Sequence, residues 1–210
     1  KKSRDANLFS KNHINGQFVT ELNEFIDIFI SKNYNLYQKH NITYFSKEIN
    51  KMALIKQTKA DKLDVRVYDT RKAMGDAAGN DVADKIVELL GKKDEINMIF
   101  AAAPSQNETL AALLERKDVD WTRVNAYHMD EYIGLPADAP QRFGLFLKEA
   151  IFSKVPFKSV NYIDCTGSDP EVECKRYGDM LSKVKIDIVV LGIGENGHIA
   201  FNDPGVADFN

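Results

Sequence analysis

The sequence predicts an α/β fold in which a mostly parallel sheet carries helices on both faces. Two observations predict it. From Leu63 onward, short apolar runs alternate with longer stretches whose apolar residues recur at helical spacing. The chain of 210 residues is 44% hydrophobic and 28% charged, which is typical of a globular domain with a sizeable core. Strands that alternate with helices in this way form βαβ units and hence parallel sheets.

The apolar runs predict strands over 63–70, 96–103, 123–130, 160–164 and 186–194. The stretches between them predict helices over 71–91, 104–116, 143–152 and 169–184. The first helix is the clearest, because Val82, Ile86 and Leu89 fall on one face and Gly91 follows as a C-terminal cap. Ligands of such folds bind at the carboxyl ends of the strands. We therefore expect the functional residues in the loops that follow the strands.

Residues 1–51 differ in composition from the rest. They are crowded with Asn, Lys, Ile and Phe, and Met52 is the first methionine of the chain. We expect the domain to cover 52–210, and 1–51 to be either an ordinary N-terminal extension or a misassigned leader. Within this segment a helix is predicted over 19–32, since Leu22, Phe25, Ile26 and Phe29 recur at helical spacing.

Charge and composition exclude several classes of partner. A formal net charge of −3 gives no reason to expect nucleic acid or an anionic membrane. No apolar run is long enough to span a membrane. Cys165 and Cys174 do not form a C-x-x-C pair, which favours two reduced thiols in a cytoplasmic protein. His13, His40 and His128 share no ligand spacing with acidic residues or cysteines, so no metal site is predicted.

Gly192, Gly194 and Gly197 follow the last predicted strand as G-x-G-x-x-G. A dinucleotide site would need a helix that begins at this loop, but Pro204 and Gly205 stop a helix before it is established. We therefore interpret Gly194 and Gly197 as positions where the backbone approaches a small ligand closely.

The same loop presents His198. Asn196, Asn202 and Asp203 surround it in the sequence with amides and a carboxylate. A carboxylate beside an imidazole orients it, which suits a role in proton transfer. The alternative is a hydrogen-bonded loop histidine with no chemical role.

Two further groups of polar residues lie at predicted strand ends. Asp130 and Glu131 fall where the third predicted strand ends, so at least one carboxylate should point into the same crevice as His198, and we expect Glu131 to bind the substrate. Ser105, Gln106 and Asn107 open a helix, whose N-terminus favours a phosphate. The alternatives are a pair of solvated charges and a simple helix N-cap.

Taken together, "NAYHMDEYIGLP" and "LGIGENGHIAFNDPG" resemble the glucosamine-6-phosphate deaminase (isomerase) family over residues 52–205. The related 6-phosphogluconolactonases share the turn at the histidine but continue differently after it. The resemblance implies a Rossmann-like sugar-phosphate isomerase/deaminase fold, with no cofactor, in a homo-oligomer of the cytoplasm. It implies conversion of glucosamine 6-phosphate and water to fructose 6-phosphate and ammonia. The alternatives are another amino-sugar phosphate such as galactosamine 6-phosphate, a non-catalytic sugar-phosphate-binding module, and an inactive product of an interrupted gene.

The resemblance also implies roles for single residues. Asp130 matches the base that moves a proton between C2 and C1, and His198 matches the general acid–base of ring opening. Asn196 stands beside that histidine. Asp203 stands where the family more often has Glu, the carboxylate that pairs with the histidine. Because Asp is one methylene shorter, a weaker pairing is expected.

Two features depart from the family. The loop "AAAPSQNE" replaces one that is usually richer in Gly and Thr, which suggests a subset with a different substrate. The family also continues for about another hundred residues past the histidine motif. The resemblance therefore predicts a truncated member, with the C-terminal part of the fold missing.

Overall fold

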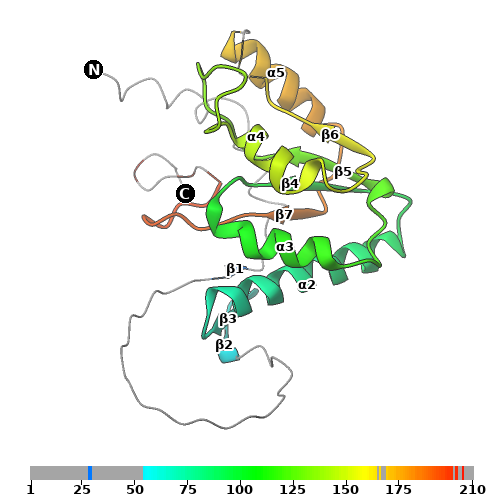
Figure 1. Cartoon of the computed structure of the whole chain (residues 1–210), viewed down its shortest axis with the longest axis vertical. Helices are drawn as coiled ribbons and strands as arrows, with labels where there is room; N and C mark the ends of the chain where they lie inside the picture. The colour runs from blue at the N-terminus through cyan, green and yellow to red at the C-terminus, as the bar shows by residue number, and fades with distance from the viewer. Residues whose placement is uncertain are drawn as a thin grey trace.

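The computed structural model describes residues 28–29, 54–164, 166, 169–200, 202 and 205. In the described part of the chain, a small sheet and a larger sheet with its helices account for the regular structure (Figure 1). No helix among these residues is long and apolar enough to cross a membrane.

The larger sheet has four parallel strands in the order β6-β5-β4-β7. Its strands are β4 (Ile96–Phe100), β5 (Val124–His128), β6 (Ser159–Asn161) and β7 (Ile188–Val190). Phe100 lies opposite both His128 and Val190. The last residues of β4, β5 and β7 are therefore level with one another, so the loops after them start at one edge of the sheet.

The predicted helices are present at nearly the predicted bounds. They are α2 (Arg71–Leu90), α3 (Asn107–Glu115), α4 (Phe143–Leu147), its π-helical continuation η4 (Lys148–Phe152) and α5 (Pro170–Leu181). Two 3₁₀ turns precede α3 and β5: η2 (Pro104–Gln106) and η3 (Trp121–Arg123).

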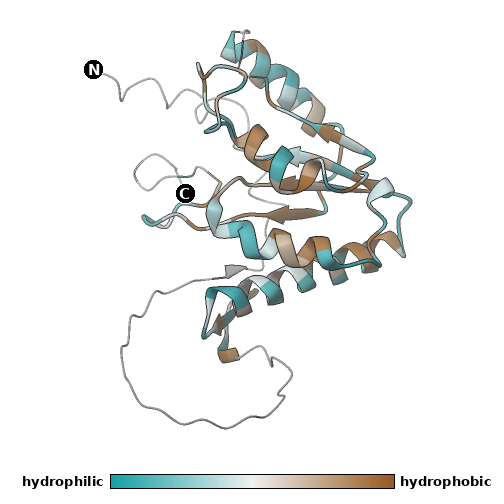
Figure 2. Cartoon of the chain, in the orientation of Figure 1, coloured by the Kyte–Doolittle hydropathy of each residue, from teal (hydrophilic) through white to brown (hydrophobic). Residues whose placement is uncertain are grey.

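Helices cover both faces of the parallel sheet, which confirms the predicted fold class. On one face, residues of α2, α3 and η4 such as Ile86, Leu113 and Ile151 pack against strand residues such as Phe100 in one buried cluster. On the other face, α5 contributes Tyr177 to a smaller cluster. Figure 2 shows α5 as largely hydrophilic, and among the described residues its cluster has four buried members whereas the first cluster has seventeen. The first face therefore holds most of the core.

Helices α2 and α3 pack closely because two glycines of α2 leave room for α3. A Cβ on Gly79 would lie 2.5 Å from the carbonyl oxygen of Thr109, and a Cβ on Gly75 would lie 2.3 Å from Cβ of Glu108. Such distances are shorter than any ordinary van der Waals contact. The contact fixes the N-terminal end of α3, and with it the loop after β4.

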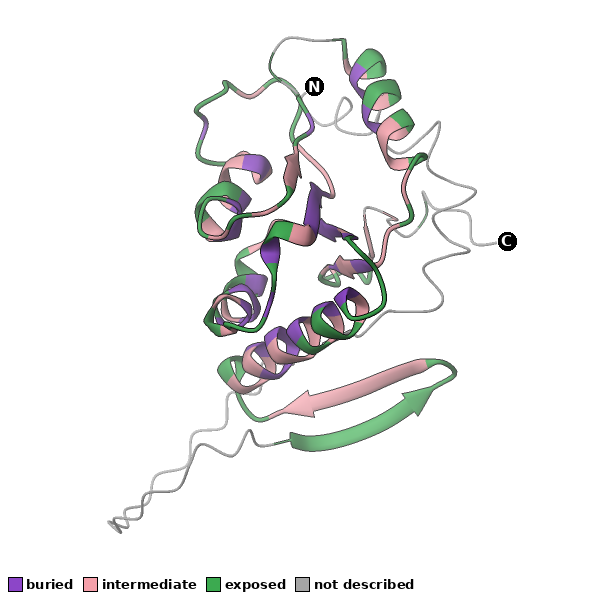
Figure 3. Ribbon diagram, turned by 90° about the vertical axis from the view of Figure 1, so that its right-hand side faces the viewer, coloured by how far each residue is buried: buried purple, intermediate pink, exposed green. Residues whose placement is uncertain are grey.

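The predicted strand over 63–70 is present as β3 (Leu63–Tyr68), but it does not join the parallel sheet. It pairs antiparallel with β2 (Leu54–Ala60), a strand that the sequence analysis missed. Asp61, with φ of 55°, lies in the turn between them. Charged residues alternate along β3, and its side chains are half-buried while β2 is exposed (Figure 3). This pattern is typical of an antiparallel hairpin, whereas the buried apolar runs of β4 and β5 are typical of parallel strands.

The helix predicted over 19–32 is wrong at two positions. Ile28–Phe29 form the short strand β1, which pairs in parallel with β3. These β-branched and aromatic residues favour a strand wherever a partner edge is available. The rest of 19–32 lies outside the described residues, and the boundary at residues 51 and 52 stays a prediction. Of the two cysteines, Cys174 is a free, partly buried thiol, and Cys165 lies outside the described residues.

Candidate functional site

Three loops start side by side at the carboxyl edge of the parallel sheet. The Ala101 amide donates to the carbonyl of Val190 at 2.9 Å, and the Met129 amide donates to the carbonyl of Phe100 at 3.0 Å. The pairing of β4 with β7 and of β4 with β5 thus continues one residue past each strand. These loops carry the residues that the sequence analysis selected.

Asp130 follows β5 and is partly buried. The pKa of its carboxyl is raised to about 6, mainly by burial and in addition by the negative charge of Glu131, while the charge of His198 opposes this shift. The opposing effect of His198 means that the two side chains lie within electrostatic range of each other. The carboxylate of one loop thus feels the charge of the imidazole of another, and their joint role in one site stays a prediction. A carboxyl group with this pKa is partly protonated near neutral pH, which suits an acid–base role.

Glu131 faces the protein interior. Its side chain has no exposed surface, and its carboxylate accepts hydrogen bonds from the backbone amides of Tyr132, Phe143 and Gly144 at 2.9–3.0 Å. Arg142 lies beside it, with Nε 3.4 Å from Oε2. These contacts occupy the carboxylate that was expected to bind substrate. They favour a structural link between the loop after β5 and the start of α4.

The loop 191–200 is a tight turn that is built around its glycines. The amide of Gly194 donates to the carbonyl of His198, and the amide of Gly197 donates to the carbonyl of Gly194, both at 2.9 Å. Gly197 has a φ of +85°, which only glycine adopts without strain. The ring of His198 covers Gly194 so closely that a Cβ there would lie 2.1 Å from Cε1 of the imidazole. The glycines thus serve to place His198.

Asn196 orients the imidazole. Its Oδ1 lies 2.7 Å from Nδ1 of His198 and also accepts the His198 amide at 3.2 Å. Since Oδ1 is an acceptor, this contact favours a proton on Nδ1 and a lone pair on Nε2. The side chain of Asn202 donates to the carbonyl of Ile199 and so braces the turn. Asp203, the predicted partner carboxylate of His198, lies outside the described residues.

The predicted phosphate loop lies next to the glycine loop. A Cβ on Gly192 would lie 3.8 Å from Oγ of Ser105. Ser105 and Asn107 are exposed, whereas Gln106 is buried, and neither amide atom of its side chain has a hydrogen-bond partner among the described residues. The loop therefore presents the Ser105 hydroxyl and the Asn107 amide to solvent near Gly192, whereas the amide of Gln106 is buried.

The sequence analysis missed Arg71 at this loop. Its Nε lies 2.7 Å from Oε1 of Glu108, and its Nη2 donates to the carbonyl of Pro104. About half of the side chain is exposed. The two segments are 33 residues apart in sequence, so only the packing of α2 on α3 brings them together. Helical spacing alone could not have predicted this contact.

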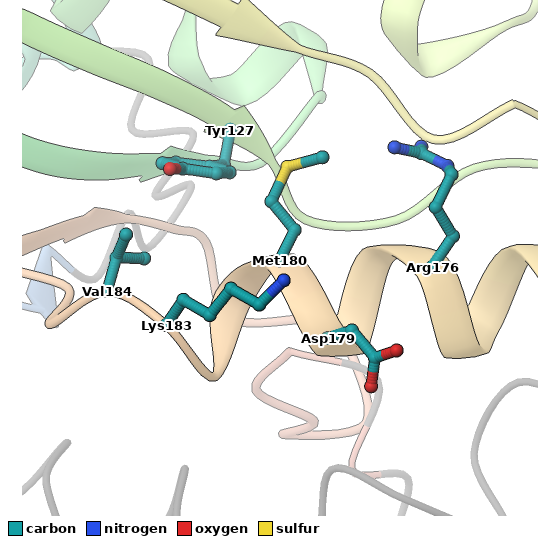
Figure 4. A pocket seen from close by; sticks show the side chains of 6 residues that line it. All are labelled: Tyr127, Arg176, Asp179, Met180, Lys183 and Val184. Atoms are coloured by element: carbon teal, nitrogen blue, oxygen red, sulfur yellow. The ribbon is translucent and has the colours of Figure 1, made fainter.

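Two other features, a hollow against α5 and the side chain of His128, are not part of the candidate site. A hollow of about 480 Å³ lies against α5, and none of the predicted site residues lines it (Figure 4). Its lining residues are Tyr127, Arg176, Asp179, Met180, Lys183 and Val184. His128 is buried, Nε2 accepts the amide of Ile163 at 2.6 Å, and burial lowers its pKa to about 4. His128 is thus a neutral core residue. Among the described residues, no cluster of three acidic, histidine or cysteine side chains could hold a metal ion.

Comparison with known proteins decides the family. The model of the family glucosamine-6-phosphate isomerases/6-phosphogluconolactonase matches residues 69–202, which is more than half of the chain. The chain belongs to this family. Its matched range contains both Asp130 and His198, all of the first motif, and the second motif as far as Asn202.

Relatives and solved structures agree with this assignment. The glucosamine-6-phosphate deaminase of Listeria monocytogenes serotype 4a is 42% identical over 130 residues, which are 62% of this chain and 56% of that protein. The solved structure of a monomeric glucosamine-6-phosphate deaminase is 27% identical, with a TM-score of 0.58 over 65% of this chain and 57% of that one. The 6-phosphogluconolactonase of Thermotoga maritima is 26% identical, with a TM-score of 0.54 over 60% and 59%. The chain spans a little over half the length of these proteins.

Proposed function

We propose that the chain catalyses, or forms the main part of an enzyme that catalyses, the conversion of glucosamine 6-phosphate and water to fructose 6-phosphate and ammonia. The observation that supports the proposal is that the loops of Asp130 and His198 start at one edge of the sheet, where the charge of His198 lowers the pKa of Asp130. The 42% identity to a glucosamine-6-phosphate deaminase supports the choice of reaction.

Asp130 is the proposed base. The isomerisation moves a proton from C2 of the open-chain sugar to C1, and a carboxylate near the substrate carbons accepts and returns that proton. The pKa of about 6 makes Asp130 a stronger base than an exposed aspartate, while most of it stays ionised at pH 7. Fructose 6-phosphate forms when water replaces the amino group, which leaves as ammonia.

His198 is the proposed acid–base group of ring opening. One group must take the proton of the anomeric hydroxyl while the ring oxygen gains a proton, and an imidazole can do both near neutral pH. The contact of Nδ1 with Asn196 favours Nε2 as the nitrogen that exchanges the proton with the sugar. Asp203 is proposed to pair with the same ring.

The phosphate is proposed to bind at the start of α3. Ser105 and Asn107 would donate hydrogen bonds from their side chains, and the N-terminus of the nine-residue helix favours an anion. Arg71 also lies at this loop, where its guanidinium pairs with Glu108. Gly192 lies beside this loop and leaves room for the sugar, whereas the space at Gly194 is filled by the ring of His198.

The test is ammonia release from glucosamine 6-phosphate, coupled to the formation of fructose 6-phosphate. We expect turnover by the unmodified chain and its loss in Asp130→Asn and His198→Gln. Galactosamine 6-phosphate in the same assay tests the alternative substrate. Ligand-dependent thermal stabilisation without turnover of either sugar would contradict the proposal in favour of a sugar-phosphate-binding module, and the absence of both effects would leave neither function standing.

Two accompanying expectations concern the whole protein. The resemblance predicts a homo-oligomer in the cytoplasm, whereas one of the similar solved structures is that of a monomeric enzyme. Sedimentation of the purified chain at several concentrations measures its oligomeric state. A fluorescent fusion in the source cell reports its location.

A further inference from the structure

The carboxylate of Glu131 connects the beginning of the loop after β5 with the beginning of α4. Its Oε1 accepts the amides of Tyr132 and Phe143 at 2.9 Å, and its Oε2 accepts the amide of Gly144 at 3.0 Å. Arg142 lies 3.4 Å from Oε2, and only 14% of its side chain is exposed. A buried carboxylate that accepts three amide hydrogen bonds beside a guanidinium is held in one orientation.

These contacts cap α4 from outside the helix. The residue at the N-cap position, Arg142, makes no side-chain hydrogen bond to the first turn. Glu131 supplies that acceptor from twelve residues earlier in the sequence. Gly144 allows the approach, because a Cβ there would lie 3.2 Å from Oε2 of Glu131. The loop between β5 and α4 is thereby closed onto the buried core.

Asp130 is attached to this closed loop. The chain is fixed on one side of Asp130 by the bond from the Met129 amide to Phe100, and on the other side by Glu131. A base that moves a proton between adjacent carbons needs a carboxylate held within a fraction of an ångström of its working position. The backbone around Asp130 meets that requirement only while both anchors are intact.

We propose that Glu131 is a positioning residue, whose buried carboxylate fixes the loop after β5 and so holds Asp130 in its working position. The inference rests on the proposed function, in which Asp130 is the base. In this role Glu131 acts through the backbone amides that it binds, and it does not bind the substrate.

The charge of Glu131 has a second effect. The pKa of Asp130 is raised by burial and by the neighbouring negative charge of Glu131, and the charge of His198 opposes this shift. Arg142 pairs with Glu131. A neutral side chain at position 131 therefore lowers the pKa of Asp130. One side chain, Glu131, thus influences both the position and the pKa of the base, and two variants separate these effects.

The experiment compares the unmodified chain with Glu131→Asp and Glu131→Gln. Aspartate keeps the charge but is one methylene too short to reach all three amides. We expect its kcat to fall about 10- to 100-fold, with KM changed less than about threefold and the acid limb of the pH profile unchanged. Glutamine loses the charge, and we expect the acid limb of kcat/KM to move to lower pH by up to about one unit. Glu149→Gln, at an exposed position on η4, is the matched control.

A folded Glu131→Asp with unchanged kcat overturns the inference, as does a folded Glu131→Gln with an unchanged acid limb. A fall in thermal stability with neither kinetic change shows a merely structural role and overturns it as well. If Glu131→Gln does not fold, the kcat of Glu131→Asp decides. If the unmodified chain turns over neither amino sugar, the proposed function fails. The inference is then judged by ¹³C NMR titration of the Asp130 carboxyl, whose midpoint should be lower in Glu131→Gln than in the unmodified chain.

Discussion

The two halves of the candidate site are built differently. Asp130 follows β5, all of whose residues are buried, and the next side chain is tied to three backbone amides. His198 lies in the loop 191–200, all of which the structure describes and none of which is fully buried. That loop holds its shape through a short turn of glycines and the contact with Asn196. The base is therefore positioned by the core, and the imidazole by local backbone conformation.

This difference has a chemical reason. Proton abstraction from carbon needs a base in a fixed place, whereas ring opening needs a group that reaches both the anomeric hydroxyl and the ring oxygen. A buried anchor suits the first task, and an exposed glycine turn suits the second. Substitutions in the two halves should therefore have separable effects.

The largest effect is expected from Asp130→Asn, which removes the base and leaves the shape. The rate of ammonia release should fall by about 10²–10⁴-fold, which is the usual contribution of a well-placed general base. Steady-state kinetics with a coupled ammonia assay measures it. Asp138→Asn, in the exposed loop that follows Glu131, is the matched control and should keep the rate of the unmodified chain. A loss of less than about tenfold in Asp130→Asn would contradict its role as the base.

A smaller effect is expected from Gly194→Ala, which keeps the imidazole but displaces it. The added Cβ would lie 2.1 Å from Cε1 of His198, so the ring must move. We expect kcat to fall about 10- to 100-fold with the fold intact. Gly178→Ala in α5 has no atom within 4 Å of the added Cβ and should not change kcat. Equal activity of the two variants would show that the ring position is not fixed by the turn.

The helix contact that positions the predicted phosphate loop is tested by Gly79→Ala. The carbonyl oxygen of Thr109 lies 2.5 Å from the added Cβ, so α2 and α3 must separate. Such overpacking should reduce the free energy of unfolding by about 1–3 kcal/mol. Gly178→Ala should instead raise it by up to about 1 kcal/mol, since alanine favours a helix. The midpoints of urea unfolding measure both, and a stable Gly79→Ala would mean that the helix pair is looser than the contact implies.

The sequence predicts the parallel sheet and its helices well because their signals are local. The apolar run of β4 and the helical period of α2 are legible from neighbouring residues alone. It also predicts the loops of Asp130 and His198, because parallel strands align their carboxyl ends. It does not predict that Glu131 turns inward, since its partners lie about twelve residues away.

The other features that the sequence does not predict also depend on contacts between distant segments. The pairing of β3 with β2 and β1 depends on which edge is available, and the contact of Arg71 with the phosphate loop depends on the packing of α2 on α3. Both are properties of the assembled domain. A sequence pattern specifies what a segment can form and which side it buries, but the partner is chosen by the whole fold.

The smallest effect concerns stability and again separates the two halves. Burial is the main reason that the pKa of Asp130 is about 6 in the folded chain, against 3.8 in the unfolded one. The folded state therefore binds the proton more tightly, and stability falls as pH rises from about 4 to about 6. Above pH 6 the destabilisation persists in full, and below pH 4 it is absent. Asp130→Asn should remove this pH dependence and stabilise the chain at pH 7 by on the order of 1 kcal/mol, a value that allows for partial exposure.

Urea unfolding of Asp130→Asn and the unmodified chain at pH 4, 5, 6 and 7 measures this effect. The advantage of the variant should grow between pH 4 and 6 and then level off. His198→Gln is the comparison from the exposed half. Because the charge of His198 lowers the pKa of Asp130, its loss should extend the destabilising range slightly toward higher pH. If Asp130→Asn is more stable yet inactive, the buried half of the site keeps a charged base at the expense of stability. Equal stability of the variant and the unmodified chain at every pH would contradict this, because it would mean that solvent reaches Asp130 as freely as it reaches the loop of His198.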